Sequence, residues 1–408
     1  MSSPPDTEPA RWAPTGRTVG AVCAVGILVV GQLYVVLPVL NRLAQDWDTS
    51  RSAVTWTTTA FGLAYGAGFL VTGPLSDRFG RRPVIVGGLL ATVGGSLIVA
   101  LAPGLATGLA ARVVQGLTAS FFAPAAFAYL SERIAPERRI FALTCLTSSF
   151  LAAGVVAQVL AQLVGNAWGW HAIFVTGALA FVISAGVLRF VLEPGPERAI
   201  APDTPAPGPA GTLRAVFAPF GGLLRRPRLV LLYLSCLAVL GSFVGIYTGI
   251  QLTPPDGVGS SNGALLALRA SAIPAMVAVP ILASRLGVIA PATRVIGALG
   301  IAGIAAAITA VPLGGVWVAA WLLVFVAAIA VAAPAAVQAI AAQAGAARGA
   351  ATALYTFALF LGASAGPQVA NLVAHRGYSS VALAIAVLSL TGAALAAAST
   401  GVRSAVPV

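Results

Sequence analysis

The chain of 408 residues is 59% hydrophobic and 8% charged, whereas soluble globular proteins carry about 25% charged residues, so the composition excludes an ordinary soluble domain. Its mean hydropathy of +0.95 indicates a membrane protein. The formal charge of +12 comes entirely from arginine, and no soluble basic domain is expected to carry a nucleic-acid site.

Apolar runs of about 20 residues recur along the chain, and each is long enough to cross a bilayer core of about 30 Å. Backbone groups inside lipid must be satisfied within the segment, so these runs are expected to be α-helices. We predict an all-α membrane protein with twelve spans, near residues 19–40, 54–75, 84–102, 105–129, 140–164, 172–191, 229–250, 263–283, 293–311, 316–340, 351–373 and 380–398.

Arginines gather in alternate connections between the predicted spans. If both termini are cytoplasmic, only Arg42, Arg51 and Arg376 lie in outer loops, while Arg112 and Arg269 lie inside spans. Cytoplasmic loops carry an excess of basic residues, so we predict a multi-pass protein of the cell membrane with both termini in the cytoplasm. Most of the protein surface is then expected to contact its partner, the lipid bilayer.

The stretch GPLSDRFGRRP, residues 73–83, places one acid and three arginines in a short predicted turn between two apolar runs. A segment this charged is expected in water at the membrane surface. It resembles the signature between the second and third helices of major facilitator transporters, which is filled here by Gly73, Leu75, Asp77, Arg78, Gly80, Arg81 and Arg82. In that family the segment is a latch that helps to hold the outward-facing state; anchoring by positive charges is the alternative.

The two halves of the chain resemble each other. Residues 122–139 align with 332–349, residues 157–165 with 366–374, and residues 77–80 with 284–287, at nearly one offset. Duplication of a six-helix unit is the organisation of the major facilitator fold, whose substrate site lies near the midplane where the halves meet. We therefore predict two pseudo-symmetric six-helix bundles at 1–192 and 229–408. The connection at 193–228 is a Pro/Ala/Gly-rich cytoplasmic linker that can end in an amphipathic helix.

Arg112 lies about two turns into the fourth predicted span, and Gln115 and Gly116 share its helical face. An arginine inside a membrane is costly, so we expect it to face the bundle interior or a water-filled cavity. The pattern R-x-x-Q-G resembles a second family signature, which in proton-coupled drug exporters is linked to proton movement. The alternative is an arginine that snorkels to the outer interface.

Arg269 lies in the eighth predicted span, where it can bind an anionic substrate group or a carboxylate, or reach the outer surface. A third family signature, G-x-x-x-G-P, marks the fifth helix of antiporters. The fifth span lacks it, and the eleventh span carries it as Gly362, Gly366 and Pro367. Small residues at this spacing let helices pack closely and proline bends one, so we assign these three residues and Gly116 to helix packing. The displacement weakens the inference of antiport.

Acidic residues are expected only near the ends of spans, which leaves no mid-membrane carboxylate to carry a proton. The cysteines lie in separate apolar runs and the two histidines are isolated, so no cofactor or metal is expected. Mildly polar and aromatic residues suit a moderately hydrophobic organic molecule. The predicted cavity is lined by Gln32, Tyr34, Gln158, Gln162, Ser242, Tyr247, Trp321, Gln338, Tyr355, Thr356 and Phe360. Each of these can instead be helix-packing glue.

The chain is therefore identified as resembling the twelve-helix drug:proton antiporter type of major facilitator transporter, and is expected to be a monomer. The predicted function is export of a drug-like molecule or natural product across a bacterial membrane by proton antiport with alternating access. An uncoupled facilitator or an importer of a small polar solute is the alternative, favoured by the missing carboxylate. A membrane enzyme or signalling protein is remote, because no acids, metal ligands or nucleophile–base pairs cluster.

Overall fold

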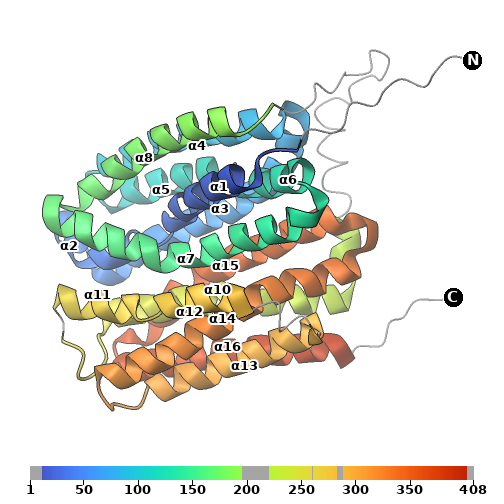
Figure 1. Ribbon diagram of the computed structural model, residues 1–408. Helices are drawn as coiled ribbons and strands as arrows, with labels where there is room; N and C mark the ends of the chain where they lie inside the picture. Colours follow the sequence, from blue (N-terminus) through green and yellow to red (C-terminus); the bar gives the residue numbers. More distant parts are fainter. Residues whose placement is uncertain (1–11, 195–219, 260, 283–287, 402–408) are drawn as a thin grey trace, which may run out of the picture.

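The computed structural model describes residues 12–194, 220–259, 261–282 and 288–401, and these residues form helices joined by short turns, without strands (Figure 1). The first part of the chain contains α1 (Thr15–Gly31), η1 (Leu37–Val39), α2 (Leu40–Asp46), α3 (Arg51–Phe79), α4 (Arg81–Ala100), α5 (Leu105–Ala119), α6 (Ala123–Arg133), α7 (Pro136–Trp168) and α8 (Trp170–Val191). The second contains α10 (Pro227–Leu252), α11 (Asn262–Ala270), α12 (Ile273–Leu282), α13 (Pro291–Thr309), α14 (Gly315–Ala344), η3 (Gly345–Ala347), α15 (Arg348–Ala374) and α16 (Tyr378–Gly401).

Every predicted span corresponds to one of these helices or to a broken pair, so the all-α prediction is confirmed. By length and hydropathy alone, eight helical stretches of the described residues could cross a membrane, with α5 and α6 together counted as one, or nine if the bent α7 counts as one span. The remaining spans are interrupted or more polar. Most of the predicted linker, residues 195–219, lies outside the described residues. Residues 220–224 near its end are helical.

Helices α1–α8 pack mainly on one another and form the upper group in Figure 1, while α10–α16 form the lower group. The groups meet where α3 packs along α15 and where α7 packs on α11 and α12. We call the end of the molecule at which α1 begins and α16 ends the arginine-rich end; it holds Arg78, Arg81, Arg133 and Arg189. The opposite, arginine-poor end holds Asp46, Arg51, Trp168 and Arg376.

Three predicted spans are interrupted within their length. The breaks fall at residues 32–36 after α1, 120–122 between α5 and α6, and 271–272 between α11 and α12. A proline is the second residue of each following helix, at Pro38, Pro124 and Pro274. Proline lacks the N–H that a continuing helix needs and its ring clashes with the preceding turn. Unbroken hydropathy concealed these interruptions.

The predicted turn at 73–83 is mostly helix, which corrects the sequence interpretation. Helix α3 continues through Gly73 to Phe79, α4 begins at Arg81, and Gly80 alone makes the turn with φ of 88°. That conformation strains residues with a Cβ and costs glycine little. A helix can continue into water beyond the membrane, so polarity does not mark its end. The aligned segment 284–287 of the second half lies outside the described residues.

The tightest crossing joins α10 and α15. A methyl group on Gly362 would overlap the carbonyl of Leu237, and one on Gly366 would overlap the carbonyl of Gly241. Glycines at this spacing let the two backbones touch, as small residues do between membrane helices. Pro367 follows directly inside α15. Gly116 similarly packs α5 against the carbonyl of Phe61 in α3.

Candidate functional site

Arg112 is fully buried within the first group of helices, and each of its three nitrogens donates a hydrogen bond. Nη2 lies 2.7 Å from the carbonyl oxygen of Gln32, Nη1 lies 2.5 Å from Oε1 of Gln115, and Nε lies 3.3 Å from the carbonyl oxygen of Thr57. The guanidinium carbon lies 4.3 Å from the centre of the Phe61 ring, a cation–π contact. The charge therefore faces the bundle interior.

Gln32 is the C-cap residue directly after α1, so Arg112 binds a backbone carbonyl at the break in the first span. Gln115 extends the network, because its Nε2 donates to Oε1 of Gln32 at 3.1 Å and to Oγ of Ser96 in α4 at 2.8 Å. Helices α1, α3, α4 and α5 are thus tied at one point. This network belongs to the first group alone, so its geometry supports a positioning role for Arg112.

A second constellation lies between the two groups, along α7 and α10. We call it the α7/α10 column, and it consists of Gly154, Gln158 and Gln162 on α7 and Phe243, Tyr247 and Gln251 on α10. Each set recurs every four residues and so shares one helix face. At one end, the Phe243 ring packs directly on Gly154, and Tyr34 meets Phe243 edge-on with ring centres 5.8 Å apart.

Arg269 closes the other end of the column, toward the arginine-poor end. Its Nη1 donates to Oε1 of Gln162 in the first group and its Nη2 donates to Oε1 of Gln251 in the second. The side chain is fully buried and is the penultimate residue of α11, beside the break before α12. Arg269 therefore does not reach the surface, and it bridges the two groups of helices.

Polar atoms without partners mark the middle and the end of the column. Oε1 of Gln158, the hydroxyl of Tyr247 and Nε of Arg269 are buried and have no hydrogen-bond partner among the described residues. Tyr247 lies within electrostatic range of both Tyr34 and Arg269. Buried polar groups are nearly always hydrogen-bonded in native proteins, so several such atoms together in one interface indicate a place where a ligand binds.

The two groups are also joined by a set of uncharged side chains that we call the polar seam: Ser52, Thr55 and Thr59 on α3 with Ser364, Gln368 and Asn371 on α15. Thr59 Oγ1 donates to the carbonyl oxygen of Ser364 at 2.7 Å. Gln368 Nε2 donates to the hydroxyls of Thr59 at 2.9 Å and Thr55 at 3.3 Å. Asn371 Nδ2 donates to Ser52 Oγ at 2.7 Å. The seam lies in the arginine-poor half and closes that end.

Other predicted cavity residues lie outside the column. Ser242 accepts from Ser389 of α16 at 2.8 Å, and the Tyr355 hydroxyl donates to the carbonyl of Ala333 in α14 at 2.7 Å. Gln338 is exposed and accepts from Arg294. These three bond within the second group.

Three further predicted residues are placed as follows. Thr356 donates to its own helix at Thr352, and Trp321 packs edge-on against Trp317 of the same helix. Phe360 packs on Tyr65 and Phe69 of α3, so it does lie between the groups.

At the arginine-rich end, Arg81 ties three helices of the first group together. Its Nη2 lies 2.8 Å from Oε1 of Glu132 at the end of α6, and its Nη1 donates to Oγ of Ser76 in α3 at 2.6 Å. Arg82 donates to the carbonyl of Arg189 at the end of α8, and Arg78 lies exposed beside the Phe79 ring. The side chain of Asp77, which the latch prediction includes, lies outside the described residues.

No carboxylate side chain among the described residues is buried. Asp46, Asp48, Glu132, Glu137 and Asp256 are exposed and Glu193 is half-buried, all near helix ends. Within the same residues no group of three or more His, Cys, Asp or Glu could hold a metal ion.

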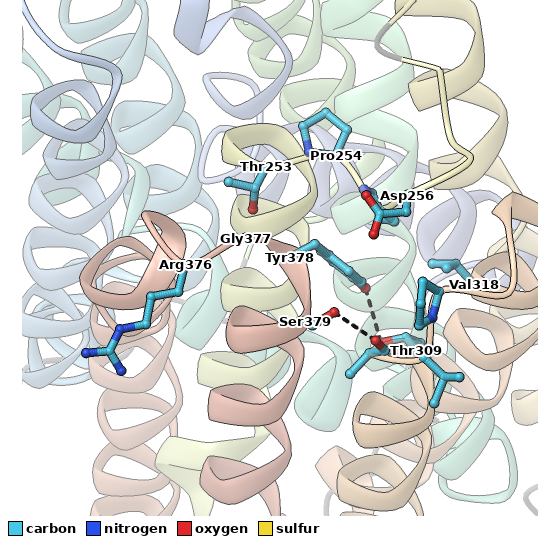
Figure 2. A pocket seen from close by; sticks show the side chains of 13 residues that line it. Thr253, Pro254, Asp256, Thr309, Val318, Arg376, Gly377, Tyr378 and Ser379 are labelled. Carbon is cyan, nitrogen blue, oxygen red and sulfur yellow. Dashed lines mark hydrogen bonds between the residues drawn. The ribbon is translucent and has the colours of Figure 1, made fainter.

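A cavity of about 200 Å³ opens at the arginine-poor end of the second group (Figure 2). Its walls include Tyr378, whose hydroxyl donates to Thr309 at 3.1 Å, and Ser379, which donates to the carbonyl of Ala310 at 2.8 Å; Asp256 and Arg376 also line it. All its lining residues belong to helices α10–α16 and their connections. This cavity therefore lies within one group, whereas the α7/α10 column lies between the two groups and is the stronger candidate.

Sequence reasoning missed Phe243, Gln251 and the polar seam. The internal repeat held one signal, because residues 157–165 align with 366–374 and this alignment pairs Gln162 with Asn371. Both residues bond across the boundary between the groups, Gln162 to α11 and Asn371 to α3. A repeat-related pair of amides at the arginine-poor end was therefore a detectable sign of paired contacts.

Comparisons with known proteins agree with this architecture. Residues 22–367 match the sequence profile described as "Major Facilitator Superfamily". The crystal structure of the human organic anion transporter MFSD10 (TETRAN) superimposes with a TM-score of 0.70 at 16% identity, over 94% of this chain and 99% of that one. The likeness supports the twelve-helix, two-bundle fold.

Among curated proteins, the "Multidrug resistance protein B homolog" of Mycobacterium tuberculosis is 29% identical over 178 residues, 44% of this chain and 33% of the relative. The "Chloramphenicol resistance protein" of Pseudomonas aeruginosa is 34% identical over 164 residues, 40% of this chain and 39% of the relative. "Multidrug resistance protein MdtL" of Klebsiella pneumoniae is 29% identical over 167 residues, 40% of this chain and 43% of the relative. These matches span less than half the length of each relative.

Proposed function

The chain belongs to the Major Facilitator Superfamily and is a multi-pass membrane transporter of small molecules; on that basis we propose that it exports a small organic molecule from a bacterial cytoplasm by alternating access. The names of the multidrug and chloramphenicol resistance relatives support export. The α7/α10 column is the proposed substrate site. The observation that carries this assignment is the set of unpartnered buried atoms of Gln158, Tyr247 and Arg269 between the two groups of helices.

We propose that the arginine-rich end faces the cytoplasm together with both termini, and that the protein lies in the inner membrane. Excess arginine on cytoplasmic connections supports this orientation. The polar seam then seals the outer side. The two bundles, 1–192 and 229–408, rock about the column, and opening the outer side separates α3 from α15 and α7 from α11.

The segment from Gly73 to Arg82 is the proposed latch of this movement. The contacts of Arg81 with Glu132 and Ser76 support it, because they tie the ends of α3, α4 and α6 into one unit. A rigid corner at the cytoplasmic end lets the first bundle turn as a body.

Proton antiport is the proposed source of energy, with Arg112 and Gln115 as the candidate coupling residues. Their network joins the break in α1 to α3, α4 and α5, so a change in its hydrogen bonds would reshape one wall of the translocation path. One observation favours a second candidate, an uncoupled facilitator. The carboxylates whose side chains are described all lie near helix ends, where none can carry a proton across the membrane interior.

The test uses inverted membrane vesicles with an acidic interior and a pH-sensitive dye. Lipophilic cations, organic anions, neutral antibiotics such as chloramphenicol, and sugars are added in turn. Antiport predicts that a transported compound accumulates and releases protons from the interior, and that Arg112→Ala loses both. Equilibration without accumulation or proton release establishes the facilitator. If no compound crosses faster than in vesicles without the protein, the export proposal is wrong.

A further inference from the structure

Arg269 is a buried cation that makes no ion pair with any carboxylate whose side chain is described. Its two hydrogen-bond partners, Gln162 and Gln251, are neutral amides. The ion pairs formed among the described residues, Arg81–Glu132 and Arg133–Glu193, lie at the arginine-rich end. A buried charge is costly unless an opposite charge and hydrogen bonds compensate it. The column therefore has an excess of positive charge at one end.

The comparison with Arg112 shows that burial alone does not explain this arrangement. Arg112 uses all three nitrogens on acceptors of its own group of helices and also faces an aromatic ring. In Arg269, Nε has no hydrogen-bond partner among the described residues, and the other two nitrogens donate to residues from opposite groups. A guanidinium has five N–H donors in a planar fork that matches a carboxylate.

The rest of the column has a different chemistry. A rise of about 12 Å, at 1.5 Å per residue from position 243 to position 251, separates the level of Gln251 from that of Phe243. Between them lie the unpartnered Gln158 Oε1 and the Tyr247 hydroxyl, and at the far level lie the rings of Tyr34 and Phe243. The column thus offers a cation, then neutral polar groups, then an aromatic surface, along a length of about two aromatic rings.

We infer that the molecule transported through this site is an organic anion, with an acidic group that binds Arg269 and an aromatic or similarly flat apolar body that packs against Tyr34 and Phe243. The inference rests on the proposed function and specifies its substrate class. The acid supplies the missing counter-charge, and charge-assisted hydrogen bonds to a guanidinium are about twice as strong as neutral ones.

The same geometry couples binding to opening of the arginine-poor end. An acid that binds the fork of Arg269 competes with the amide oxygen of Gln162. Losing that contact weakens the packing of α11 on α7, one of the places where the two groups are joined. The substrate thereby weakens the closure that must open for its release.

The first experiment measures binding by the thermal stabilisation of the purified protein. Biphenyl-4-carboxylate is the probe, because its length matches the column, and biphenyl-4-carboxamide is its neutral counterpart. The carboxylate should bind at least about tenfold more tightly than the carboxamide, and Arg269→Gln should remove that preference, since hydrogen bonds to charged groups exceed neutral ones by this order. Arg376→Gln, which removes an exposed charge from the same end, should leave the preference intact.

The second experiment measures the opening of the arginine-poor end directly. Spin labels at Gln45→Cys and His375→Cys, both exposed and one in each group, report the distance across the arginine-poor end in protein with Cys23, Cys145 and Cys236 replaced by alanine. The carboxylate should raise the open-to-closed ratio at least about threefold, and the carboxamide should not. Gln162→Ala should tighten carboxylate binding and favour the open form, because it removes the competing acceptor. Arg269→Lys keeps the charge and should retain part of the response.

Equal binding of carboxylate and carboxamide to the wild-type protein would overturn the inference, whatever the variants do. So would an Arg269→Gln variant that is folded and still prefers the carboxylate. Neither readout requires transport. If the vesicle assay shows export of neutral compounds alone, the proposed export function is supported and the inference of an anionic substrate is refuted. If the carboxylate binds through Arg269 but no compound is exported, the export proposal is refuted and the anion-binding site is supported.

Discussion

Gln368→Ala tests whether the polar seam holds the arginine-poor end closed. The side chain of Gln368 donates two hydrogen bonds across the boundary, to Thr59 at 2.9 Å and Thr55 at 3.3 Å. Hydrogen bonds between membrane helices contribute about 0.6 kcal/mol each on average, so the pair stabilises the closed form by about 1.2 kcal/mol. Because 1.4 kcal/mol is a tenfold change, the open-to-closed ratio should rise roughly sevenfold.

The substitution leaves no new buried donor behind. Thr59 still donates to the carbonyl of Ser364, and Thr55 still donates to the carbonyl of Ser52. The change should therefore act on the equilibrium between the two forms more than on the stability of either bundle. Spin labels at Gln45→Cys and His375→Cys measure the ratio, and thermal melting measures stability.

Ser389→Ala is the matched control. It removes a buried hydrogen bond of 2.8 Å between α16 and Ser242 of α10, which lies within one group and does not cross the boundary. The control should leave the open-to-closed ratio unchanged. The reasoning is refuted if Gln368→Ala leaves the ratio at its wild-type value, or if Ser389→Ala shifts it by the same factor.

Three further variants, one of them with a matched control, test separate parts of the structure. Arg112→Ala should abolish transport in the vesicle assay and lower the melting temperature. The variant loses three hydrogen bonds to a charged group, and such bonds contribute about 1.5–3 kcal/mol each. Full transport with an unchanged melting temperature would exclude Arg112 from the mechanism. Gly366→Ala should destabilise the fold by about 1–3 kcal/mol through overlap with the Gly241 carbonyl. Gly186→Ala in α8, with nothing within 4 Å of the added methyl, should be neutral in the same melting assay. Asp77→Asn should slow turnover more than it weakens substrate binding in transport kinetics; a pure loss of affinity would count against the latch.

Hydropathy predicted the spans well because the membrane imposes one requirement on every residue that crosses it. The predicted spans at 172–191 and 229–250 differ by at most two residues at each end from α8 and α10. Hydropathy could not reveal the breaks, because broken and continuous helices need the same apolar composition in lipid. Pro38, Pro124 and Pro274 held the missing information, but Pro334 and Pro367 lie inside unbroken helices, so proline alone does not locate a break.

The candidate site was harder to predict, because helix periodicity gives the face of a residue and not its neighbour. Gln158 and Gln162 share a face in sequence, and the structure does bring that face to Arg269. Ser242 and Tyr247 also lie on one helix, five residues apart, yet Ser242 bonds to α16 while Tyr247 lies in the column. The seam joins residues 309 positions apart, at Thr59 and Gln368, and no local pattern encodes such a pairing.

The chemistry of the contacts between the two groups suits an interface that must open. Threonine, glutamine, asparagine and serine exchange a hydrogen bond with each other for one with water, so the net free energy of each bond is only about 0.5–1.5 kcal/mol. The crossing of α10 and α15 is different, because its glycines bring the two backbones into contact and have no polar side chains that could bond to water after separation. In the proposed cycle the first kind of contact is broken and formed again, while the second keeps α10 and α15 of the same group together. Arg269 also bonds across the boundary between the groups, but unlike the residues of the polar seam it is charged. Opening without an anion would leave its guanidinium with a single amide partner, Gln251 of α10. In the proposed cycle, a cation at that point makes opening depend on what occupies the column.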